Sequence, residues 1–233
     1  MSTAREAFEI LTKQVIACKR CPRLVKYRQE VARTKRRAYR DWEYWGKPVP
    51  PFGDPNAKLL VIGLAPAAHG GNRTGRVFTG DRSGDFLYRA MYEAGFASQP
   101  ESISRNDGLT LSGAYITAAA RCAPPDNKPT PEEFANCRPY LERELNFLSE
   151  LRVIVALGKL AFDAYLTILR DRGVIRSRAP FQFGHNREHS IAPGLPVLIS
   201  SYHPSQQNTS TGKLTAAMLR DVFDRAREIV DQP

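Results

Sequence analysis

Residues 58–84 read KLLVIGLAPAAHGGNRTGRVFTGDRSG. This stretch decides the fold, because it opens on a mostly apolar run, residues 58–62, that predicts a buried β-strand. Between Gly63 and Gly84, six glycines alternate with polar and aromatic side chains. Loops longer than about 12–15 residues are usually functional or disordered, and this composition is not that of a disordered segment. We interpret it as a functional loop after a core strand, rather than as a plain glycine-rich connection.

The rest of the chain alternates apolar runs with amphipathic segments. Further strands are predicted at residues 114–118, 152–157 and 196–200. Helices are predicted at residues 84–94, 131–149, 159–169 and 212–230. Ser83 is the expected cap of the first of these helices. Short strands separated by helices predict a single α/β domain over residues 1–233, with a mainly parallel central sheet flanked by helices on both faces.

The first 57 residues depart from this pattern. A helix is predicted over residues 3–17 and a second near 23–33, and the latter belongs to a basic, aromatic and finally proline-rich arm. Residues 33–40 contain five basic side chains. Three aromatic residues follow them, namely Trp42, Tyr44 and Trp45. Basic side chains interleaved with aromatic ones suit phosphates and exposed bases.

The charge balance points to a polyanionic partner. The net charge is +10, from 34 Lys and Arg against 24 Asp and Glu, which favours nucleic acid over an anionic membrane surface. The alternative is a generically basic protein that its charge keeps soluble. There is no apolar run of about 18 residues, and the charged N-terminus lacks the apolar core of a secretory signal. We therefore expect a cytoplasmic protein with no membrane partner.

The four cysteines are Cys18, Cys21, Cys122 and Cys137. In a cytosolic protein a C-x-x-C pair favours a metal or cluster over disulfides. Cys122 and Cys137 are too far apart for a local knuckle, so a shared site would tie remote segments together. Thiolates without a histidine at ligand spacing leave zinc or an iron–sulfur cluster open. The alternative is four unrelated cysteines.

The loops after the predicted strands carry the polar residues. In parallel α/β sheets, ligands bind beyond the carboxyl ends of the strands. The glycine-rich loop follows the first strand, residues 119–129 follow the second, Gly158 the third, and residues 201–205 the fourth. We expect these loops to converge on one crevice.

Three motifs in this order resemble those of the type 5 uracil-DNA glycosylases, the bacterial and archaeal iron–sulfur members of the uracil-DNA glycosylase superfamily. They are GLAPAAHGGNRTGRVFTGD at 63–81, RCAPPDNKPTPEE at 121–133 and YHPS at 202–205. The resemblance implies a monofunctional base-excision repair enzyme. It flips uracil, or a related deaminated or damaged base, out of DNA and hydrolyses the N-glycosidic bond, leaving an abasic site. It also implies a monomer and a structural [4Fe–4S] cluster on the four cysteines.

The resemblance also assigns residue roles. His203 would stabilise the departing uracil anion, Asp81 would activate or position the water, and Asn127 would assist. Phe78 would stack on the flipped base, within a substrate pocket that also includes Gly63, Ala65 and His69. The residues expected to contact DNA are Ser205, which would hold a phosphate, and Arg76, Arg36 and Arg37.

The sequence departs from the best-known members of the superfamily at three positions. Ala65 stands where those enzymes carry an Asp that activates water, Ala67 where a Tyr often excludes thymine, and Ala118 where some families have an Asn. A roomier, less polar pocket predicts a wider range of bases. The missing carboxylate at residue 65 is also the best support for a different hypothesis, a non-catalytic iron–sulfur nucleic-acid-binding protein. An iron–sulfur electron carrier is disfavoured, because so many polar loops lie away from the cysteines.

Structural roles remain open for several of these residues. Asp81 could cap the following helix, and Asn127 lies in a turn that suits Asn for its own reasons. His203 could be a buried histidine with satisfied hydrogen bonds, and Phe78 an ordinary core residue. His69 could hydrogen-bond the glycine-rich loop, and Arg76 could bind that loop instead of phosphate.

Overall fold

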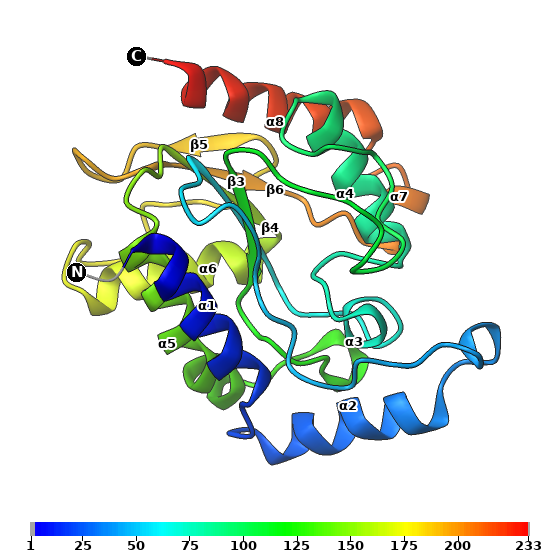
Figure 1. Ribbon diagram of the computed structural model, residues 1–233. Coiled ribbons are helices and arrows are strands. Elements are labelled where there is room, and N and C mark those ends of the chain that lie inside the picture. Colours follow the sequence, from blue (N-terminus) through cyan, green and yellow to red (C-terminus); the bar gives the residue numbers. More distant parts are fainter. Residues whose placement is uncertain (1–2, 233) are drawn as a thin grey trace.

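The computed structural model describes residues 3–232. Its centre is a six-stranded sheet in the order β1-β3-β2-β4-β6-β5 (Figure 1). The strands are β1 (Phe52–Gly53), β2 (Leu59–Gly63), β3 (Ala114–Ala118), β4 (Val153–Leu157), β5 (Arg187–His189) and β6 (Val197–Ser201). The helices are α1 (Ala4–Ile16), α2 (Pro22–Thr34), α3 (Gly71–Thr74), α4 (Arg82–Glu93), α5 (Pro131–Phe147), α6 (Lys159–Asp171), α7 (Gln206–Ser210) and α8 (Ala216–Asp231), with 3-10 turns η1 (Arg37–Tyr39) and η2 (Pro125–Asn127).

The four long strands are parallel, as the sequence predicted. β2 lies between β3 and β4, so that Val61 pairs with Ile116 on one side and Val155 on the other. β6 continues the parallel sheet beyond β4, whereas the edge strands β1 and β5 are antiparallel to their neighbours. Every residue of β2, β3 and β4 is buried, which is why these strands read as continuous apolar runs.

Helices cover both faces of the sheet (Figure 1). Alternate residues of a strand point to opposite faces, and in β2 Leu59 and Val61 join the core formed with α4 and α8. Leu60 and Ile62 point the other way, into the core formed with α5 and α6. α1 packs on α5 outside this second layer. None of the helices in residues 3–232 is long and apolar enough to cross a bilayer.

Two helix starts differ from the first expectation. The cap of α4 is Asp81, the alternative left open above, and not Ser83, because the Asp81 carboxylate accepts a hydrogen bond from the Gly84 amide at 3.1 Å. The last helix begins at Ala216, capped by Thr215, and not at Gly212. Gly212 has a φ of +71°, a left-handed conformation that separates α8 from the short helix α7.

Candidate active site

The ring of Phe78 lies on the end of the central strand. A Cβ at Gly63, the last residue of β2, would come within 2.6 Å of the Phe78 ring, so only glycine allows this approach. Phe78 itself has a φ of +49°, which is rare for a bulky residue and indicates that the surrounding loop imposes its conformation. The ring centroids of Phe78 and His203 are 5.7 Å apart, with an interplanar angle of 34°. The loops after β2 and β6 therefore converge, as predicted.

His203 lies in a tight position at the end of β6. Gly158, just after β4, has a φ of +91°, and a Cβ there would be 3.3 Å from the Cβ of His203. Asn208 donates to the His203 carbonyl at 2.8 Å and so fixes the loop. Burial lowers the pKa of His203 to about 4, so the imidazole is neutral at pH 7. A neutral imidazole offers one N–H donor and one acceptor.

Asp81 has both a capping contact and a confined carboxylate. Besides capping α4, it lies so close to Gly70 that a Cβ there would be 1.8 Å from its Oδ2. Burial raises the pKa of Asp81, against the effect of hydrogen bonds from the Gly84 and Ser83 amides and the charge of Arg73. The capping role and a role toward a bound water are compatible, because a carboxylate has acceptor capacity beyond one amide.

His69 joins the glycine-rich loop to the basic arm. Its Nδ1 lies 3.0 Å from the Tyr44 hydroxyl, and its carbonyl accepts a hydrogen bond from Arg73 Nε at 2.7 Å. Burial lowers the pKa of His69, and the charges of Arg36 and Arg73 add to this. The structural role left open for His69 is therefore present. Ala65 lies earlier in the same loop, just after β2, and has no ionisable group.

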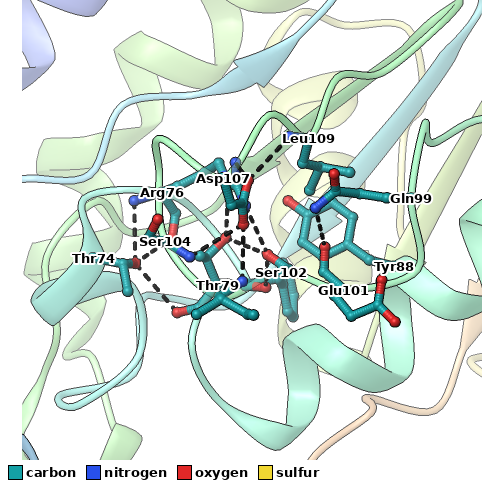
Figure 2. Close-up of polar contacts among 12 residues, drawn as sticks. Thr74, Arg76, Thr79, Tyr88, Gln99, Glu101, Ser102, Ser104, Asp107 and Leu109 are labelled. Carbon is teal, nitrogen blue, oxygen red and sulfur yellow. Dashed lines mark hydrogen bonds and ion pairs between the residues drawn. The ribbon is translucent and has the colours of Figure 1, made fainter.

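The expectation that Arg76 contacts DNA is replaced by a structural role. Its side chain is 4% exposed and forms an ion pair with Asp107 at 2.7 Å. Figure 2 shows the guanidinium among polar partners, since it also donates to Thr79 at 2.9 Å and to Ser102 at 3.1 Å. Asp107 in turn accepts from the backbone amides of the loop around it, those of Ile103, Ser104 and Leu109. Arg76 thus locks this loop onto the glycine-rich segment.

The aromatic residues of the arm pack against the protein itself and are not free to stack on bases. Tyr39 and Trp42 flank the guanidinium of Arg73, whose carbon lies 3.9 Å and 4.1 Å from their ring centroids. Trp45 lies against Gly75, where a Cβ would be 2.9 Å from the indole. The sequence showed basic residues interleaved with aromatic ones, a pattern that suits nucleic acid. In the structure, the partner of these rings is the glycine-rich loop.

The family model described as the Uracil DNA glycosylase superfamily matches residues 50–227. The chain belongs to this superfamily. A Type-5 uracil-DNA glycosylase of Thermus thermophilus is 51% identical to it over 97% of this chain and 98% of its own. Relatives of the same name from Mycobacterium leprae and Pyrobaculum aerophilum are 50% and 47% identical, over 94% and 96% of this chain and 94% of each of their own. These relatives confirm the resemblance to type 5 enzymes.

The remaining sequence-predicted residues of this glycosylase lie on its surface. Asn127 is exposed in the η2 turn, where it and Asp126 have φ values of +55° and +54°, a conformation that Asn tolerates well. Within residues 3–232, no hydrogen bond joins its side chain to Asp81 or His203. Ser205 caps α7 by accepting from the Asn208 amide at 3.4 Å. Arg36 and Arg37 are exposed at the start of η1 and are accessible to a partner.

The four cysteines of the glycosylase come from three segments and form no disulfides. Cys18 and Cys21 lie between α1 and α2, Cys122 follows β3, and Cys137 is in α5. Cys21 and Cys122 pack together with Leu24. Arg121, next to Cys122, forms a fully buried ion pair with Glu144 of α5 at 2.6 Å, so β3 and α5 are held together beside the cysteines. Among the described residues, no three His, Cys, Asp or Glu side chains form a group that could hold a metal ion.

Proposed function

We propose that this enzyme repairs DNA by flipping out uracil and hydrolysing its N-glycosidic bond, which leaves an abasic site. The observation that carries the proposal is the meeting of Phe78 and His203 at the carboxyl edge of the parallel sheet. Full-length relatives at 47–51% identity named as uracil-DNA glycosylases support it. They also disfavour a non-catalytic DNA-binding protein, despite the alanine at residue 65.

In the proposed reaction, the leaving base is stabilised more than the water is activated. Phe78 stacks on the flipped base, and neutral His203 donates to the uracil oxygen on which negative charge develops. Glycosidic cleavage can proceed through a cationic sugar, which needs only a weak nucleophile. Asp81 then holds the water, and the exposed Asn127 turn assists when DNA closes over it. The small side chains of Ala65 and Ala67 leave room for other deaminated bases, such as hypoxanthine or hydroxymethyluracil.

A uracil-containing oligonucleotide tests the function directly. We expect an alkali-labile abasic site at the uracil and no borohydride-trapped adduct, because the motifs contain no obvious Schiff-base lysine. An oligonucleotide with thymine at the same position is the control. Binding of the uracil strand without any cleavage would favour the non-catalytic hypothesis.

Replacing Asp81 by asparagine tests its part in the chemistry. Asparagine keeps an oxygen for the Gly84 amide and removes the charge, so the helix cap survives while the water loses its acceptor carboxylate. We expect the single-turnover rate to fall by at least roughly tenfold with little change in DNA affinity. Ser83→Ala is the matched control, since Ser83 lies on the same turn without the predicted role. Full activity of Asp81→Asn would leave Asp81 as a helix cap only.

We propose further that the exposed basic arm holds DNA phosphates through Arg36, Arg37 and Arg40. Each phosphate contact adds about 0.9 to the slope of log affinity against log salt. Changing these three residues to Gln should therefore flatten that slope, while cleavage at saturating enzyme stays nearly intact. A triple change to Gln at Arg5, Lys13 and Arg176, which are exposed outside the arm, provides the control. An unchanged slope in the arm variant would make the arm a solvated surface.

We also propose that the four cysteines hold one [4Fe–4S] cluster with a structural role. The thiols interact electrostatically with one another, and burial raises the pKa of Cys122 to about 12 and that of Cys137 to about 11. A bound metal deprotonates a coordinating thiol outright, so a cluster would remove the protons that burial favours on these two thiols. In a single zinc site the sulfurs would lie about 3.8 Å apart, from Zn–S bonds of about 2.3 Å. A [4Fe–4S] cluster would space them more widely.

The cluster predicts a coloured protein. Protein purified without oxygen should be yellow-brown and contain about four iron and four sulfide per chain, as such clusters require. Cys137→Ser should lose the colour and melt at a lower temperature, because one of the links between α5 and the N-terminal segment would be lost, while α1 still packs on α5. A colourless protein with one zinc per chain and full stability would contradict the assignment.

A further inference from the structure

The carboxylate of Asp81 is held between two backbone segments of the glycine-rich loop. One is the backbone at His69 and Gly70, because a Cβ on Gly70 would overlap its Oδ2. The other is Gly80, which precedes Asp81 in the chain. The position of the carboxylate therefore depends on the separation of these two backbone segments.

Arg73 joins the same two segments. Its Nε donates to the His69 carbonyl at 2.7 Å, and its Nη2 donates to the Gly80 carbonyl at 2.6 Å. His69 immediately precedes Gly70, and Gly80 immediately precedes Asp81. The side chain is only 3% exposed, so solvent does not compete for these bonds.

The basic arm holds Arg73 in turn. Tyr39 and Trp42 lie within 4.1 Å of its guanidinium carbon. The arm backbone pairs with α3, where Trp45 donates to the Arg73 carbonyl at 2.9 Å and Gly46 to the Asn72 carbonyl at 3.0 Å. Aromatic rings near a desolvated guanidinium stabilise its charge. Among the side chains of residues 3–232, Arg73 Nη1 is one of the buried groups without a hydrogen-bond partner.

We propose that Arg73 is a positioning residue for the glycosylase reaction. It holds the Asp81 carboxylate in place, and its own guanidinium is held by the rings of Tyr39 and Trp42. The inference rests on the proposed function. It gives the arm a second task besides binding phosphate, because the arm then sets the geometry of the reaction. A misplacement of about 1 Å in a catalytic group can cost about 10²-fold in rate.

The charge of Arg73 has a consequence that a purely structural contact would not have. Burial raises the pKa of Asp81, the Gly84 and Ser83 amides oppose this most strongly, and smaller effects come from Asp85, which raises the pKa, and Arg73, which lowers it. Removing the positive charge therefore raises this pKa, so the carboxylate protonates at a higher pH. The acidic limb of the rate profile should move toward neutral pH in Arg73→Gln and stay in place in Arg73→Lys.

The experiment measures single-turnover excision at saturating enzyme from pH 5 to 8, together with DNA affinity. We expect Arg73→Gln to lose roughly 10- to 100-fold in rate, with affinity changed less than about twofold and the acidic limb shifted upward. Arg73→Lys should lose rate without the pH shift, because lysine keeps the charge but cannot bridge both carbonyls. Tyr39→Leu/Trp42→Leu, which keeps Arg73 itself but removes the rings that hold it, should lose an intermediate amount of rate. Arg105→Gln is the matched control, because Arg105 lies 4.6 Å from the Trp45 ring centroid and is exposed.

The outcomes separate this inference from the proposed function. If the wild-type enzyme does not cleave the uracil strand, the proposed function fails. If it cleaves and folded Arg73→Gln has the wild-type rate and pH profile, the positioning role fails. A loss of affinity alone would make Arg73 a phosphate contact and also overturn the inference. If Arg73→Gln does not fold, the lysine and double aromatic variants decide, since wild-type rates in both would contradict the role.

Discussion

Replacing His203 by alanine is expected to lower the single-turnover rate of uracil excision by roughly 10²–10³-fold, the usual effect of removing one donor to a developing anion. The side chain is confined by Gly158 and faces Phe78, and alanine leaves no side-chain donor at this position. DNA affinity should change little. His189→Gln is the control, because His189 lies in the edge strand β5, away from the loop after β6.

The protonation state of His203 gives this prediction a pH signature. Because burial lowers its pKa to about 4, the neutral form acts throughout the neutral range. The rate should not fall as pH rises through 6.5, as it would if an imidazolium were the donor. A wild-type rate that falls as the pH rises through about 6.5 would contradict the role of neutral His203.

The lowered pKa of His203 also makes the stability of the fold depend on pH. The folded pKa of His203 is below its unfolded value of 6.5, so the unfolded state binds the proton more readily. Its contribution is therefore fully present above pH 6.5 and is lost as the pH falls toward 4, by up to about 3 kcal/mol. A His203→Gln variant should lose less stability than the wild type over this window, as measured by urea unfolding.

The central sheet and the convergence of its loops were predictable from the sequence for a physical reason. Parallel strands covered on both faces are mostly apolar, so β2, β3, β4 and β6 stand out as apolar runs despite a few buried polar residues such as Thr117 and Ser200. Their carboxyl ends share an edge, which is enough to bring Phe78 and His203 together. The edge strands β1 and β5 are short, partly exposed and not continuously apolar, and they gave no comparable signal.

The partners of the charged and aromatic residues could not be predicted in the same way. Arg76 has the same appearance in the sequence whether it faces a phosphate or Asp107, which is 31 residues away. Trp42 was interpreted as a contact for bases, yet together with Tyr39 it encloses the guanidinium of Arg73. For α4, both Asp81 and Ser83 are good capping residues, and only the backbone position of the Gly84 amide selects Asp81. Such pairings depend on tertiary structure and leave no local pattern.

Replacing Asp107 by alanine is expected to lower the free energy of unfolding by about 3–5 kcal/mol, because it leaves the Arg76 charge buried without its partner. Burial alone would raise the pKa of Asp107, but hydrogen bonds from Arg76 and the Leu109 and Ser104 amides outweigh it and lower that pKa to about 2. The carboxylate thus contributes its stability above a pH of about 3.8 and loses it only as the pH falls through 2. Urea unfolding at pH 7 measures the full loss.

Two further variants distinguish the buried charge from the other bonds of Asp107. Arg76→Met combined with Asp107→Ala removes both charges and should recover part of the loss, because methionine fills the apolar stem position of the arginine. Recovery should stay incomplete, since the amides of Ile103, Ser104 and Leu109 still lose their acceptor. Glu30→Gln, which breaks the exposed Arg33–Glu30 pair, should cost less than about 1 kcal/mol. A loss at Asp107 no larger than that at Glu30 would mean that the Arg76 network does not anchor the glycine-rich loop.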